Sequence, residues 1–137
     1  MLYDNCTEIE LLKIVAEVAP KNMKAKFVSY EEQDYDSVYF ETQPSTQLSL
    51  SQDRLDGGAI CHMLESIEDA GWSYTITTPV YFDGIKQNRK YGCYVYSPFD
   101  SSRGEPKNCC LGDSMAEAVT KAFIMVFTSD IIREENE

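Results

Sequence analysis

Apolar side chains recur at helical spacing near the start of the chain. The members of this stripe are Leu11, Leu12, Val15, Val18 and Ala19. A spacing of three and four residues places them on one face of a helix. Thr7 and Glu10 precede the stripe in the arrangement of a capping box, in which each side chain satisfies a backbone donor of the first turn. The pattern therefore predicts a helix over residues 7–19, which Pro20 ends.

Two further segments show the same helical period. The first carries Ile60, Met63, Leu64, Ile67 and Ala70, and the second carries Ala118, Val119, Ala122, Phe123 and Val126. Gly71 is placed to form a left-handed cap at the end of the first segment. Ser114 and Glu117 form a second capping box before the other. We expect helices over 57–70 and 114–128, and the broad apolar stripe of the latter predicts a central position.

Other segments alternate with a period of two or are rich in aromatic and β-branched residues, as strands are. The predicted strands are 26–30, 37–41, 72–78, 91–97 and 108–111. Residues 31–36 are predicted to form a hairpin loop, and the polar segment 42–52 is predicted to be a loop. Asp83 and Gly84 give a further turn signal.

The order of these elements favours an α+β protein. We expect an antiparallel sheet of about 4–5 strands packed with three α-helices in an α/β/α sandwich-like arrangement. The chain has 137 residues and shows neither an internal repeat nor a low-complexity linker, so we expect a single domain over 1–137.

Charge changes this picture more than any motif does. The chain has 23 acidic and 12 basic residues, one histidine and a formal net charge of -11 at pH 7. Such a surface repels nucleic acid and anionic membranes and favours basic partners. We therefore expect no direct binding of nucleic acid and no membrane association. The longest strongly apolar run, 122–127, is far shorter than the roughly 20 residues that cross a bilayer.

Five cysteines and the N-terminal segment bear on the compartment. The odd cysteine count and the adjacent pair Cys109 and Cys110 are typical of reduced thiols and not of a secreted disulfide framework. The first seven residues lack the basic and apolar regions of a signal peptide. Both observations predict a cytoplasmic protein.

Residues 44–127 resemble the phage ABA sandwich domain family. The resemblance is carried by Pro44-Ser45-Thr46, by a helix with Met63-Leu64-Glu65 that Gly71-Trp72 closes, and by the capped segment 113–119. It implies a layered α/β/α unit from a phage or prophage accessory gene, acting in the cytoplasm of the host cell. Such genes often encode small proteins that bind and disable host machinery. The resemblance implies no catalytic residues.

The first candidate site is an acidic segment with interleaved tyrosines. Its residues are Glu31, Glu32, Asp34, Tyr35, Asp36, Tyr39 and Glu41. Spaced carboxylates can occupy a Lys/Arg groove that normally holds nucleic acid, and tyrosine is enriched in interfaces. Charge runs are more often solvated loops that keep a protein soluble, and this simpler interpretation stays open.

The second candidate is a basic and aromatic set between residues 82 and 103. It comprises Phe82, Arg89, Lys90, Tyr91 and Arg103. Cations beside aromatic rings bind phosphate-bearing molecules by charge and stacking, so the set could hold an anionic nucleotide. Cationic loops without a glycine cradle are poor predictors of phosphate binding, and two solvated loops are the simpler interpretation.

The cysteines and the histidine form weaker candidates. A zinc site from Cys93, Cys109 and Cys110 lacks the short paired spacing of structural zinc, and adjacent strand residues point to opposite faces. Cys61 and His62 diverge by about 100 degrees on a helix, so they do not face each other as nucleophile and base. We expect neither metal nor cofactor.

These observations favour a small acidic binding protein that inhibits or modulates a host protein with a basic surface. It would belong to the counter-defence or host-takeover type and mimic the charge of nucleic acid. The alternative is a protein that sequesters an anionic nucleotide signal. The second alternative is an enzyme that uses Cys93 or Cys61. The nine tyrosines are compatible with a homodimer.

Overall fold

The computed structural model describes residues 6–30, 35–41, 45–50, 57–79, 81–82, 85–86, 91–97 and 108–136. Its helices are α1 (Glu8–Val18), the short 3-10 helix η1 (Lys21–Met23), α2 (Gly57–Asp69) and α3 (Met115–Asn136). Its strands are β1 (Ala25–Tyr30), β2 (Tyr35–Phe40), β3 (Thr46–Leu48), β4 (Ser73–Thr77), β5 (Tyr81–Phe82), β6 (Ile85–Lys86), β7 (Tyr91–Tyr96) and β8 (Asn108–Gly112).

The strands are divided between two three-stranded antiparallel sheets and one small hairpin. The sheets have the orders β1–β2–β3 and β4–β7–β8, and β5 pairs with β6. The predicted α+β class is confirmed. The predicted hairpin is confirmed as the β1–β2 pair, in which Tyr30 lies opposite Tyr35. Its connection is shorter than the predicted loop because β2 begins at Tyr35 instead of residue 37.

The sequence prediction also differs from the structure at β3 and at the end of α3. The loop predicted over 42–52 is wrong for Thr46–Leu48, which form β3. Leu48 lies opposite Val38 of β2 and is fully buried, so one apolar residue anchors a strand whose other positions are polar. The backbone of α3 continues to Asn136, beyond the predicted end at 128.

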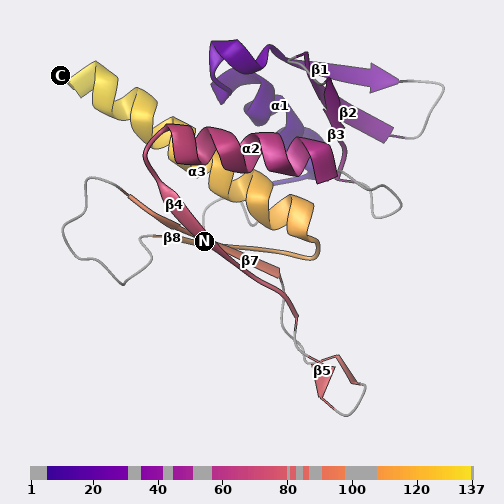
Figure 1. Cartoon of the computed structure of the whole chain (residues 1–137). Helices are drawn as coiled ribbons and strands as arrows, with labels where there is room; N and C mark the ends of the chain where they lie inside the picture. Colours follow the sequence, from indigo (N-terminus) through magenta and orange to yellow (C-terminus); the bar gives the residue numbers. More distant parts are fainter. Residues whose placement is uncertain are drawn as a thin grey trace.

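Helix α3 lies at the centre of the molecule, as its broad apolar stripe predicts. It contacts β7 and β8 on one side and packs against α1 and α2 on the other. Figure 1 shows it passing between the β4–β7–β8 sheet and the layer that holds α1, α2 and the β1–β2–β3 sheet. Every residue from Ala118 to Phe127 is buried, the pattern of a helix enclosed on all sides.

The predicted caps fix the ends of the helices. Thr7 Oγ1 accepts a hydrogen bond from the backbone N–H of Glu10 at 3.2 Å, which begins α1. Gly71, with a φ of 89°, follows the end of α2 in the left-handed conformation. The N–H of Trp72 then bonds the carbonyl of Ile67 at 3.1 Å, which completes a Schellman motif and directs the chain into β4.

Among the residues that the structure describes, no helix combines the length and the apolar character needed to cross a membrane.

Candidate functional site

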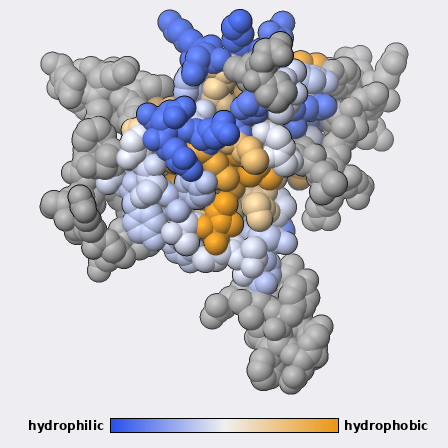
Figure 2. All heavy atoms as spheres, in the orientation of Figure 1, coloured by the Kyte–Doolittle hydropathy of each residue, from blue (hydrophilic) through white to orange (hydrophobic). Residues whose placement is uncertain are grey.

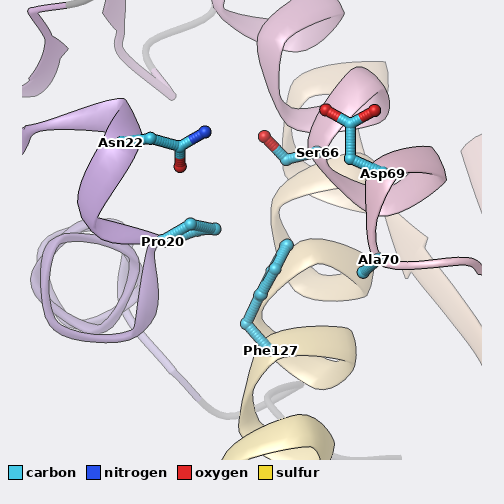
Figure 3. Close-up of a pocket in the computed structure, with 6 residues that line it drawn as sticks. All are labelled: Pro20, Asn22, Ser66, Asp69, Ala70 and Phe127. Carbon is cyan, nitrogen blue, oxygen red and sulfur yellow. The ribbon is translucent and has the colours of Figure 1, made fainter.

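A pocket of about 210 Å³ opens where η1, the end of α2 and α3 meet (Figure 3). It is lined by Pro20, Asn22, Ser66, Asp69, Ala70 and Phe127. Three segments that are distant in the sequence therefore build it. In Figure 3, Asn22 and Ser66 point toward each other, and Phe127 rises from α3 toward the space between them. The carboxylate of Asp69, on the last turn of α2, points away from that space.

Local folding signals place the walls of this pocket. Pro20 follows the end of α1 and precedes η1, so the chain turns there. Met23 of η1 is buried, and its sulfur accepts a hydrogen bond from Ser66 Oγ at 3.1 Å. Phe127 packs on Phe123 one turn earlier, with ring centroids 4.7 Å apart. The hydrogen bond from Ser66 to Met23 therefore joins α2 to η1, and the contact with Phe123 orients the Phe127 ring of α3 at the pocket.

The lining combines hydrogen-bond acceptors with apolar walls. The Asp69 carboxylate accepts hydrogen bonds and donates none at neutral pH, and Asn22 contributes an amide oxygen beside its amide donors. The hydroxyl of Ser66 is a donor toward Met23, so its lone pairs remain to accept. Pro20, Ala70 and Phe127 supply apolar surface. A ligand that fits carries several donors, a positive charge and an apolar stem.

The electrostatics of α2 favour the same kind of ligand. Glu65, Glu68 and Asp69 are exposed near its C-terminus, and its last turn holds no basic residue. A helix C-terminus carries partial negative charge, so acids there are unfavourable for the isolated fold. Figure 2 shows strongly hydrophilic residues gathered over this end of α2. The local field is therefore negative, and a cation supplied from outside would stabilise it.

Glu68 is partly engaged by the adjacent strand. Tyr74 of β4 donates a hydrogen bond to the Glu68 carboxylate. Burial, together with this bond and the charge of Glu68, raises the pKa of Tyr74. Asp69 is different: among the described residues, none forms an ion pair with it. Of these two neighbouring acids, Asp69 is the one available to a ligand.

A second carboxylate, Glu117, lies in the first turn of α3 and is used inside the fold. Its two oxygens accept hydrogen bonds from the backbone N–H of Asp113 at 3.1 Å and from Lys121 Nζ at 3.2 Å. Lys121 is nearly buried and also donates to the carbonyl of Leu111 at 2.8 Å. Ser114 Oγ accepts from the N–H of Glu117 at 3.1 Å and caps the helix. This network joins β8 to α3.

The carboxyl group of Glu8, at the start of α1, is influenced by the charge of Glu117. Partial burial and then the negative charge of Glu117 raise the pKa of the Glu8 carboxyl. The cluster of Glu8, Glu117 and Lys121 is nonetheless a junction between α1, β8 and α3. Glu117 and Lys121 form an ion pair with each other and hydrogen bonds with the backbone, as a structural ion pair does.

The predicted acidic segment is partly described. Glu31, Glu32 and Asp34 lie outside the described residues. Alternate residues of a strand point to opposite faces, so Asp36 of β2 shares a face with the buried Val38, while Tyr39 lies on the other. Glu41, just after β2, is exposed. The acidic segment as a partner-binding surface therefore stays a prediction.

Most residues of the predicted nucleotide-binding set lie outside the part of the chain that the structure describes. Arg89, Lys90 and Arg103 lie outside the described residues, and Phe82 is described through its backbone in β5. Tyr91 is half-buried at the start of β7 and packs against the core. The structure therefore does not test whether these side chains converge.

The described cysteines lie at separate places in the fold. Cys93 and Cys110 lie opposite each other on β7 and β8, and both are buried in the core. Cys61 is exposed on α2. Across the described ranges, no three His, Cys, Asp or Glu side chains gather as ligands for one metal ion.

Sequence reasoning missed the pocket because its residues carry no motif. Asn22, Ser66 and Asp69 are ordinary surface residues in the sequence, and the fold brings them together. One signal was present: the end of α2 is acidic where helices usually carry basic residues.

Compared with protein-family models, with curated proteins and with solved structures, the chain gives no significant match. The resemblance to the phage ABA sandwich domain family stays a prediction.

Proposed function

We propose that this chain is a small binding protein that docks its acidic surface on a basic surface of another protein and performs no covalent chemistry. The observation that carries the proposal is the acidic C-terminal end of α2, where Glu65, Glu68 and Asp69 are exposed without a basic neighbour in the last turn. Charges that oppose the helix dipole cost stability, and a cationic partner offsets that cost.

The net charge of -11 supports the same partner class. An acidic surface accelerates encounters with basic proteins and repels competing polyanions. The phage resemblance adds the biological setting of the proposal. In that setting the partner is a host-cell protein whose basic groove is blocked, and the chain inhibits or modulates it.

The test compares two pairs of substitutions that remove equal charge from different helices. After affinity capture from a bacterial host and identification of the captured protein, its dissociation constant is measured by calorimetry. We expect E65Q/D69N to weaken binding by about tenfold, the scale of one or two well-placed charged contacts. The control is E10Q/E17Q on α1, which we expect to change the constant by less than about twofold because exposed charges distant from an interface contribute little.

Salt separates the outcomes. Binding through exposed charges weakens as ionic strength rises, because ions screen these interactions. If the two pairs of substitutions change the dissociation constant equally, the interface does not lie at the end of α2. A further variant, E31Q/E32Q/D34N/D36N, tests the predicted acidic segment in the same assay. A partner whose affinity is insensitive to salt and to all three variants would disprove the proposal.

A further inference from the structure

We infer that the pocket between η1, α2 and α3 is an anchor site for a single arginine side chain of the partner protein. This inference rests on the proposed function, because it names the side chain by which a basic partner is held. It goes further in assigning a particular pocket and in distinguishing arginine from lysine.

The size of the pocket limits the occupant. Pockets that enclose drug-sized ligands and cofactors usually measure about 300–1,000 Å³. The volume here is about 210 Å³, and the exposed Asp69 is among its lining residues. It suits the end of one long side chain that enters from solvent, while the remainder of the partner lies across α2 and η1.

The arrangement of acceptors favours a planar group with many donors. Ser66 on α2 and Asn22 on η1 place acceptor atoms on two facing sides of the pocket, and Asp69 adds a negative charge at the α2 end of the lining. A guanidinium group carries five N–H donors in one plane and can reach both sides at once. A lysine ammonium is a compact, strongly hydrated charge with three donors, which fits one side better than two.

The apolar wall favours the same side chain. Phe127 of α3 lines the pocket and is itself held in place by Phe123, and Pro20 lies on the η1 side. Guanidinium groups stack on aromatic surfaces and are hydrated more weakly than ammonium groups, so their transfer into such a pocket costs less. The methylene stem of arginine would cover the remaining apolar surface.

The experiment uses a probe in place of the natural partner. The uniformly 15N-labelled full chain is titrated with N-acetylarginine amide, and backbone amide shifts are followed by NMR at constant ionic strength, adjusted with NaCl. We expect shifts centred on Asn22, Ser66, Asp69 and Ala70, with a dissociation constant of about 1 mM, the scale for a ligand of this size. The corresponding citrulline amide, a neutral near-isostere, should produce no shifts there.

Two variants locate the binding. D69N should raise the dissociation constant about tenfold, because it removes a charge-assisted hydrogen bond. N22A, a change at an exposed position, should raise it about threefold through the loss of one neutral hydrogen bond. E17Q removes one charge from an exposed position of α1, outside the pocket lining, and should change it by less than about twofold. Thermal unfolding of each variant verifies that the fold is intact.

The outcomes separate this inference from the proposed function. The absence of shifts at the pocket, equal effects of D69N and E17Q, or binding of N-acetyllysine amide as tight as that of the arginine amide would overturn the arginine anchor. Each of these results leaves the docking of an acidic surface standing, because it concerns one pocket. Arginine binding here, combined with a captured partner that ignores E65Q/D69N and salt, would support the pocket and overturn the docking proposal.

Discussion

The first turn of α3 and the last turn of α2 both carry a carboxylate, and the fold uses the two in opposite ways. Glu117 lies at a helix N-terminus, where negative charge is favourable, and its oxygens are hydrogen-bonded to Asp113 and Lys121. Asp69 lies at a helix C-terminus, where negative charge is unfavourable, and is among the residues that line a pocket. The contrast gives Glu117 a structural role, and we propose that Asp69 serves recognition.

Removal of the Glu117 charge should give the largest effect. E117Q keeps the shape but removes the ion pair with the buried Lys121 ammonium, and breaking a buried ion pair typically costs about 3 kcal/mol. Urea unfolding at 25 °C measures the change in the free energy of unfolding. The matched change E65Q, at an exposed position of α2, should stay within about 0.5 kcal/mol of the wild type. A loss below that limit for E117Q would show that the network is not structural.

A comparison of two glycines sharpens the same contrast at the level of the backbone. A Cβ at Gly112, before α3, would lie 2.7 Å from the backbone nitrogen of Ala118, so G112A forces β8 away from the helix and should cost about 2 kcal/mol. G71A meets a positive φ at the end of α2 and should cost about 1 kcal/mol. Thermal or urea unfolding measures the loss in the free energy of unfolding for G112A and for G71A and shows which is larger. The reverse order would mean that the β8–α3 junction tolerates displacement better than the Schellman turn.

Charge reversal at Asp69 should have the smallest effect on stability, and of the opposite sign. D69K places a cation at the C-terminal end of α2, where it interacts favourably with the helix dipole, so the free energy of unfolding should rise by about 0.5 kcal/mol. The same variant should lose the shifts that N-acetylarginine amide produces. A destabilised D69K variant would show that the Asp69 carboxylate supports the fold, which would remove the contrast with Glu117.

Local signals explain how much of the fold could be predicted. The capping residues Thr7 and Ser114 and the left-handed Gly71 act within a few residues of themselves, and all three lie at the expected helix ends. Strand β3 escaped prediction because its strand character comes from pairing with β2 and from the burial of Leu48, which no local pattern shows. The division of the strands into two sheets was not predicted either, because tertiary packing determines which strands pair.

The candidate site was less accessible to sequence reasoning than the fold. Charge indicated a cationic partner, and this inference depends on composition, which the sequence states directly. The pocket depends on the meeting of Asn22, Ser66 and Phe127, which lie on η1, α2 and α3. Such a site becomes visible when the hydrogen bond from Ser66 to Met23 and the packing of Phe127 on Phe123 are known.

The central position of α3 has a consequence for synthesis of the protein. Both three-stranded sheets are built from residues that precede this helix. The β4–β7–β8 sheet packs on α3 through β7 and β8, and the β1–β2–β3 sheet packs on α1 and α2, which in turn pack on α3. While the ribosome is still adding residues up to Phe127, the apolar faces of β7 and β8 have no helix to cover them. Domains generally fold as units, so we expect the nascent chain to stay aggregation-prone until this last segment emerges, and chaperones to be needed during that interval.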